Sequence, residues 1–114
     1  MTTTTFDALI AGGSVGGLAT AIVLNRIGAQ VRVFERSHRQ IQTRGAGVVM
    51  QPDVEFLLEQ IGSSARAVSV PLHTRQRMHR DGSVDGHPAP QLMTSWDTLY
   101  RTLRNGIPHV PYRL

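Results

Sequence analysis

The sequence contains no cysteine and no lysine, and aromatic residues make up only 5% of it. Without cysteine, the chain has no disulfides, no thiolate zinc ligands and no cysteine nucleophile. All twelve basic residues are arginines, and they are spread from Arg26 to Arg113 without forming a run. A nucleic-acid binder would need a basic cluster and a platform of stacking aromatic side chains. We therefore expect no nucleic-acid partner.

Long hydrophobic runs are also missing. The longest apolar run, residues 18–24, is interrupted by Thr20 and is far too short to cross a bilayer. The N-terminal MTTTT has neither the basic flank nor the apolar core of a signal peptide. We expect no membrane association and a cytoplasmic location. With 114 residues, 40% of them hydrophobic and 18% charged, the chain has the size and composition of one globular domain.

Glycine, by contrast, is concentrated near the N-terminus, in the sequence DALIAGGSVGGLATAIVL. The apolar residues 6–11 predict a buried strand, and residues 17–27, followed by Gly28, predict a helix. Residues 30–36, QVRVFER, predict a second strand with Val31 and Val33 on one face. A strand, a helix and a strand within about thirty residues form a βαβ unit with parallel strands. The expected fold class is therefore α/β and Rossmann-like.

Residues 37–51 are predicted to be a loop with its own glycine pair, Gly45 and Gly47. Pro52 is expected to open a helix over residues 52–61, because proline is favoured in the first helical turn. The apolar side chains expected on the inner face of this helix are Phe56, Leu57 and Ile61.

Strand patterns between residues 67 and 87 flank the pair Asp81-Gly82, which favours a β-hairpin turn. Residues 95–107 predict a further helix, with Ser95 as its N-cap and Leu99 and Leu103 in one stripe. Residues 109–114 alternate like a strand that has just begun. Because the pattern stops there, we expect the chain to be an N-terminal fragment of a longer domain.

The glycine-rich loop has the properties of a phosphate-binding turn. Gly12 is expected to make the sharp turn after the first strand, and Gly17 to let the helix pack against it. The open end of the helix then offers N–H groups to an anion, and position 14 is where a pyrophosphate comes closest. Ser14 departs from glycine there, and its hydroxyl would either crowd a phosphate or donate a hydrogen bond to it. Glu35, at the end of the second strand, is placed to accept both hydroxyls of an adenosine ribose. The alternative is a glycine-rich turn beside a surface glutamate.

Three segments carry a resemblance to a known family: DALIAGGSVGGLATAIVLNRIGAQVRVFERS, RGAGVVMQP and TSWDTLYRTL. Together they resemble the N-terminal region of FAD-dependent aromatic hydroxylases, the single-component flavoprotein monooxygenases. The GGS loop and the glycine pair followed by Gln51-Pro52 are most similar to the dihydroxypyridine hydroxylase branch. Many family members have an arginine where this chain has Trp96, so the flavin contact of that arginine is not carried over.

The resemblance implies which residues bind FAD. Gly12, Ser14 and Gly17 would hold the pyrophosphate, Glu35 the adenosine ribose, and Arg36 would lie along the adenosine. Arg44 would meet the pyrophosphate or the ribityl chain, which suits its planar, bidentate guanidinium, and residues 45–49 would run beside the isoalloxazine ring. The complete set of expected cofactor contacts is Gly12, Gly13, Ser14, Val15, Gly16, Gly17, Glu35, Arg36, Arg44, Gly45, Ala46, Gly47 and Val48.

The resemblance also implies an activity for the full-length enzyme. NAD(P)H would reduce the flavin, and the reduced flavin would activate oxygen for transfer to a small aromatic or heteroaromatic ring. No residue stands out as a catalyst of proton transfer. His73, His79 and His87 match no metal-ligand spacing, so no metal site is expected.

Residues 1–114 are thus expected to be the N-terminal, incomplete part of an FAD/NAD(P)-binding domain, with most of the substrate domain absent and no activity alone. In that family a later strand flanks the first one, so here the edge of residues 8–11 should lie open. Two alternatives remain: another FAD-dependent oxidoreductase of the same fold, and a non-catalytic dinucleotide-binding remnant. The sequence does not indicate the oligomeric state.

Overall fold

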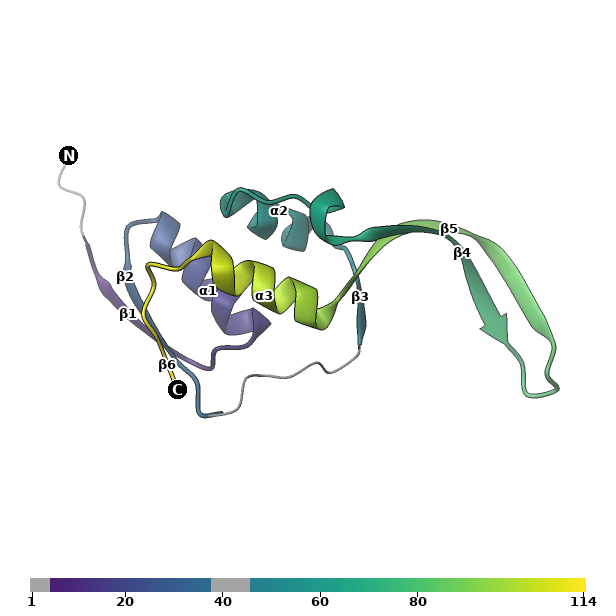
Figure 1. Ribbon diagram of the computed structural model, residues 1–114, viewed down its shortest axis with the longest axis horizontal. Helices are drawn as coiled ribbons and strands as arrows, with labels where there is room; N and C mark the ends of the chain where they lie inside the picture. Colours follow the sequence, from purple (N-terminus) through teal and green to yellow (C-terminus); the bar gives the residue numbers. More distant parts are fainter. Residues whose placement is uncertain (1–4, 38–45) are drawn as a thin grey trace.

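The computed structural model describes residues 5–37 and 46–114, and it is elongated, with extents of 62 × 35 × 19 Å. Figure 1 shows a body made of a small sheet and the helices that cover it. A long two-stranded arm projects from this body, and the C-terminus lies beside the N-terminal strands.

The body is built on the predicted βαβ unit. β1 (Asp7–Ala11) leads into α1 (Val15–Arg26), and β2 (Gln30–Phe34) returns parallel to β1. β6 (Tyr112–Arg113) pairs parallel with the other side of β2, which gives the strand order β1-β2-β6. The α/β class and the parallel strands are therefore confirmed, and α1 begins two residues earlier than the sequence predicts.

The core lies between this sheet and the helices. Val31 and Val33 point from β2 toward α1 and are buried, as their alternation predicts. α3 (Trp96–Gly106) packs against α1 and buries the predicted stripe of Leu99 and Leu103. The buried apolar side chains are Leu18, Ala21, Ile22, Ala29, Val31, Val33, Met50, Leu58, Leu99, Leu103, Ile107 and Val110.

A second, antiparallel sheet differs in part from the prediction. The hairpin turn lies where Asp81-Gly82 places it, with Gly82 at φ +85°, between β4 (Val70–Met78) and β5 (Val84–Ser95). β5 runs well past the predicted end at residue 87, up to α3. Its last residues pair with β3 (Gly47–Val49), in a segment predicted to be loop. These strands depend on partners far away in the sequence, so local patterns did not indicate them.

In α2 (Pro52–Gln60), one of the residues predicted to face the core is exposed instead. Phe56 was expected on the inner face, but 53% of its surface is exposed, whereas Leu58 is fully buried. Leu57 and Ile61 are partly buried against the core, as predicted. Phe56 instead lines an apolar hollow between α2 and α1, where Val23 is also exposed. A short 3₁₀ helix, η1 (Arg66–Val68), then connects α2 to β4.

Candidate functional site

The loop between β1 and α1 has the geometry that its glycines predict. Gly12 has φ +110°, a left-handed conformation that favours glycine. A Cβ atom at Gly17 would overlap the carbonyl oxygen of Gly12, so α1 approaches the loop more closely than any other residue allows. The two glycines therefore make the turn and the close packing for which a phosphate-binding loop needs them.

The first turn of α1 presents unpaired backbone donors. The first backbone hydrogen bond of the helix runs from the Leu18 N–H to the Ser14 carbonyl, at 2.9 Å. The N–H groups of residues 14–17 precede it and have no helical partner. The Ser14 side chain makes no capping hydrogen bond, and the first turn carries no acidic residue. Together with the helix dipole, these donors favour an anion at this end of α1.

Glu35 lies directly after β2 and is tied to the same loop. Its Oε2 accepts a hydrogen bond from the Gly13 N–H at 2.8 Å, and its Oε1 accepts one from the Ser37 N–H at 2.9 Å. The Gly13 bond and then the Ser37 bond lower the pKa of Glu35, because both stabilise the charged carboxylate. A carboxylate has about four lone-pair sites, so each oxygen can still accept a hydroxyl.

A hollow of about 630 Å³ lies at the carboxyl ends of β1 and β2. Its walls are Ala11, Gly12, Phe34, Glu35 and Arg36. Ligands of open α/β sheets bind in the crevice at this end of the strands. The hollow has the size of a small-molecule site, and Glu35 is one of the residues that line it.

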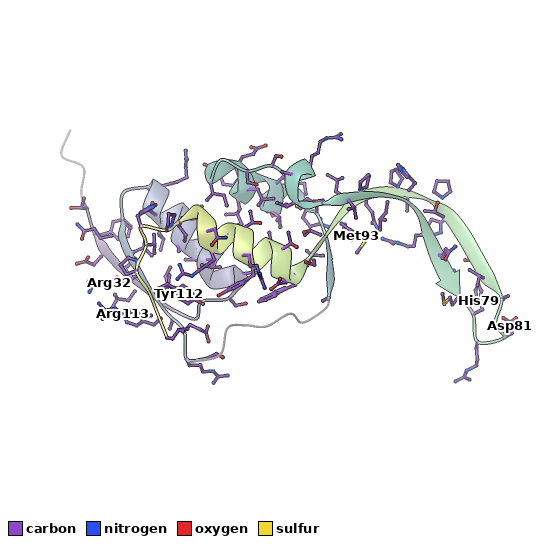
Figure 2. The ribbon with its side chains drawn as sticks, in the orientation of Figure 1. Arg32, His79, Asp81, Met93, Tyr112 and Arg113 are labelled. Carbon is purple, nitrogen blue, oxygen red and sulfur yellow. The ribbon has the colours of Figure 1, made fainter. Side chains whose placement is uncertain are left out.

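Tyr112 belongs to this site although sequence reasoning did not single it out. Its hydroxyl donates a hydrogen bond to the Gly13 carbonyl oxygen at 2.8 Å and lies 3.2 Å from the Tyr100 hydroxyl. Figure 2 shows Tyr112 pointing from β6 into the body of the molecule. The only sequence signal was the alternation of residues 110, 112 and 114, which indicated a strand but not the contact.

The second predicted cofactor segment is held at the N-terminus of α3. The Trp96 N–H donates to the Ala46 carbonyl at 3.0 Å, and Gly47 pairs with Ser95 across β3 and β5. Trp96 stacks on Tyr100 with 5.2 Å between ring centroids and 5° between planes. The described contacts thus attach Ala46 and Gly47 to α3 rather than to the glycine loop. Arg44 and Gly45 lie outside the described residues.

The histidines do not form a metal site in the part of the chain that the structure describes. His79 Nε2 lies within hydrogen-bond distance of Asp85 Oδ2, at 2.9 Å, near the far end of the arm, where Figure 2 shows His79 and Asp81. Within residues 5–37 and 46–114, no three His, Cys, Asp or Glu residues are grouped to hold a metal ion. No helix among the described residues is long and apolar enough to cross a membrane.

A βαβ unit with an open helix end, a left-handed glycine and a carboxylate beyond the second strand defines a dinucleotide-binding α/β protein. The family model for the FAD binding domain matches residues 5–100. The chain therefore belongs to the FAD-binding domain family, of the type found in flavin monooxygenases.

Two curated relatives illustrate this membership. The chain is 38% identical over 106 residues to 2,6-dihydroxypyridine 3-monooxygenase of Paenarthrobacter nicotinovorans. This alignment covers 88% of this chain and 26% of that protein. It is 33% identical over 78 residues to 3-hydroxybenzoate 6-hydroxylase of Polaromonas naphthalenivorans strain CJ2, over 68% of this chain and 19% of that one. The chain thus spans about a quarter or less of the length of these relatives.

Solved structures agree with the fold. The structure of 2,6-dihydroxypyridine-3-hydroxylase from Arthrobacter nicotinovorans matches 96% of this chain and 29% of its own, with a TM-score of 0.82 and 30% identity. The tetrameric form of 2-methyl-3-hydroxypyridine-5-carboxylic acid oxygenase matches 95% of this chain and 31% of its own, with a TM-score of 0.76 and 26% identity. The resemblance predicted from the sequence is confirmed.

Proposed function

We propose that the glycine loop and Glu35 bind the ADP half of FAD, and that the protein carrying these residues is an NAD(P)H-dependent monooxygenase of a small aromatic or heteroaromatic ring. The observation that carries the proposal is the Glu35 carboxylate, which accepts a hydrogen bond from the Gly13 N–H and belongs to a residue that lines the hollow. This arrangement supports the proposal, because the carboxylate that would accept the ribose hydroxyls is bonded to the loop that precedes α1.

The residues of the loop fit a diphosphate. The unpaired N–H groups of residues 14–17 supply donors, and Ser14 is exposed, so its hydroxyl is free to turn toward a phosphate oxygen. A Cβ atom at Gly16 would meet nothing within 4 Å, which leaves open space over the first turn of α1. Arg36 borders the hollow and would lie along the adenosine.

The flavin end is assigned by resemblance. Arg44 would bind the pyrophosphate or the ribityl chain, and residues 45–48 would run beside the isoalloxazine ring. The attachment of Ala46 and Gly47 to the start of α3 supports this assignment, because it gives that segment a fixed backbone. Bound FAD would supply the redox chemistry, and this chain would bind and orient it.

The activity of the whole protein is proposed from its relatives. One curated relative is named as a monooxygenase of 2,6-dihydroxypyridine and the other as a hydroxylase of 3-hydroxybenzoate. Residues 1–114 would form the N-terminal part of the FAD domain, and the substrate pocket would come largely from residues beyond them. The cytoplasmic location remains a prediction from the sequence.

The test uses the natural polypeptide that carries this sequence, purified at its full length. We expect one FAD per chain and NAD(P)H oxidation that 2,6-dihydroxypyridine or 3-hydroxybenzoate accelerates, with one oxygen atom of labelled O₂ entering the ring. Bound FAD with NAD(P)H oxidation but no labelled product would indicate another FAD-dependent oxidoreductase. A purified protein that binds neither FAD nor ADP would contradict the proposal.

A further inference from the structure

We propose that Tyr112 is a positioning residue for the cofactor: it orients the Gly13–Ser14 peptide so that the Ser14 N–H faces the diphosphate. The inference rests on the proposed function and adds a residue to it. Tyr112 lies 99 positions after Gly13, at the far end of the chain, and no part of the glycine motif includes it.

The hydrogen bonds around Tyr112 have a defined direction. A phenol has a single hydrogen, and the Tyr112 hydroxyl donates it to the Gly13 carbonyl at 2.8 Å. The Tyr100 hydroxyl, 3.2 Å away, must therefore be the donor to the Tyr112 oxygen. The resulting chain runs from Tyr100 through Tyr112 to Gly13, and hydrogen bonds in such chains strengthen one another.

The bond to the Gly13 carbonyl determines where the next N–H points. In a trans peptide the carbonyl and the N–H point in opposite directions, and the structure contains no cis peptide among its described residues. Because the carbonyl faces Tyr112 in the interior, the Ser14 N–H faces the outer side of the loop. Ser14 is exposed there, at the end of α1 that offers unpaired donors.

Glu35 holds the neighbouring peptide, and β6 supports both anchors. The Gly13 N–H belongs to the Gly12–Gly13 peptide and is held by Glu35. The Glu35 N–H in turn donates to the Arg113 carbonyl at 2.7 Å. Two successive peptides of the loop are thus fixed: Glu35 holds the Gly12–Gly13 peptide, and Tyr112 holds the Gly13–Ser14 peptide. Loss of Tyr112 should disturb diphosphate binding more than ribose binding.

Tyr112 also explains why residue 13 is glycine. A Cβ atom at Gly13 would overlap the ring and hydroxyl of Tyr112. Gly13 is buried against this ring, unlike the open Gly16. The guanidinium carbon of Arg104 lies 3.9 Å from the ring centroid of Tyr112, so a cation–π contact from α3 steadies the ring.

The phenol stays a donor over the working pH range. Burial disfavours the charged phenolate and raises the pKa of Tyr112 well above its usual value. The group therefore remains protonated in mildly alkaline solution.

The main test compares Tyr112→Phe with wild type in the full-length natural polypeptide, by titration of the apo form with FAD, ADP and adenosine. Tyr112→Phe should weaken FAD and ADP about tenfold, which corresponds to about 1.4 kcal/mol, and adenosine less than about twofold. Tyr100→Phe keeps the bond to Gly13 and should lose much less ADP affinity. Melting of the apo forms is measured alongside, since a merely structural role would lower stability and weaken all three ligands equally.

Unchanged ADP affinity in Tyr112→Phe, or equal losses for ADP and adenosine, would overturn the inference while leaving the proposed function standing. Wild-type protein that binds neither ADP nor FAD would instead overturn the proposed function. A further measurement uses wild type alone, so it does not depend on whether the variant folds. The ¹⁵N-labelled Ser14 amide should shift on binding ADP but not adenosine, and an equal response to both would contradict the inference.

Discussion

The carboxylate of Glu35 lies 2.8 Å from the amide nitrogen of Gly13, 22 residues earlier in the chain. This bond joins the end of β2 directly to the turn after β1. The same carboxylate borders the hollow at the strand ends. Glu35 therefore has a structural role and, by our proposal, a ligand-binding role as well.

The structural task of Glu35 predicts a pH dependence. Hydrogen bonds from Gly13 and Ser37 lower the pKa of this carboxyl in the folded chain below its usual 4.5. The unfolded chain then binds the proton more readily, so Glu35 stabilises the fold above pH 4.5, and this stabilisation is lost as the pH falls through the lower, folded pKa. Glu35→Gln should therefore lose stability relative to wild type at neutral pH, and the difference should shrink on acidification.

Denaturant unfolding of both proteins between pH 3 and 7 measures this difference. Asp7→Asn is the matched control, because Asp7 is an exposed carboxylate whose ion pair with Arg32 is 3.7 Å long. Exposed pairs of this kind contribute little, so its stability should follow wild type at every pH. An equal response of the two variants would show that the bond to Gly13 does not stabilise the fold.

The βαβ unit could be predicted because its signals are local. The glycines punctuate two apolar runs, and the alternation of Val31 and Val33 is visible within five residues. β3 and the second half of β5 form through pairs with strands far away in the sequence, since β3 pairs with β5 and β5 pairs with both β3 and β4. Pro88 and Pro90 also make the sequence of β5 look irregular. Phe56 was misplaced because a short amphipathic pattern does not reveal which side of a helix meets its neighbours.

The candidate site was predictable to the same extent. Gly12, Gly17 and Glu35 belong to one local motif, so the turn, the close packing and the proposed ribose ligand could be predicted from spacing alone. Tyr112 reaches the loop from the last strand, and only the pairing of β6 with β2 brings it there. Nothing in the residues around position 112 distinguishes a tyrosine that holds a loop from one that fills a core.

The two adjacent glycines in the first turn of α1 should tolerate alanine very differently. At Gly17 a new methyl group would overlap the carbonyl of Gly12, so α1 must move and we expect Gly17→Ala to cost about 3 kcal/mol of stability. At Gly16 the methyl group meets nothing, so Gly16→Ala should leave stability unchanged or raise it by up to about 1 kcal/mol. Thermal and urea unfolding of the apo forms would compare them.

Gly16→Ala has a second use, since the open space beside it is where we place the cofactor. This variant should fold as well as wild type and yet bind FAD more weakly. If both glycine variants melt at the same temperature, the close approach of α1 to Gly12 is not the reason why position 17 is a glycine.

The start of α3 predicts a capping effect. The Ser95 Oγ accepts a hydrogen bond from the Thr98 N–H at 3.0 Å, and the next residue, Trp96, donates to the Ala46 carbonyl. Ser95→Ala should therefore cost about 1 kcal/mol, measured by denaturant unfolding. Ser95→Asp restores a capping oxygen and adds a favourable charge at the helix N-terminus, so it should recover most of the loss. Equal losses in the two variants would argue against the cap.

The outer edge of β1 should make a polypeptide of these 114 residues associate with itself. In the described part of the chain β1 pairs with β2 alone, and Leu9 and Phe6 are 65% and 44% exposed. The N–H of Gln30 bonds to the Phe6 carbonyl, and the N–H of Gly12 bonds to the Phe34 carbonyl. The backbone N–H and C=O groups of even-numbered residues in β1 therefore point toward β2, and those of Leu9 point toward the open edge. A charged side chain on an edge strand opposes pairing with a second chain, so Leu9→Lys should lower the apparent mass in light scattering.

The control is Val23→Lys, which changes a similarly apolar residue, 42% exposed, on a helix without unpaired edge groups. It should leave the association almost unchanged, and if it disperses the chain as well as Leu9→Lys does, apolar surface rather than the strand edge drives the association.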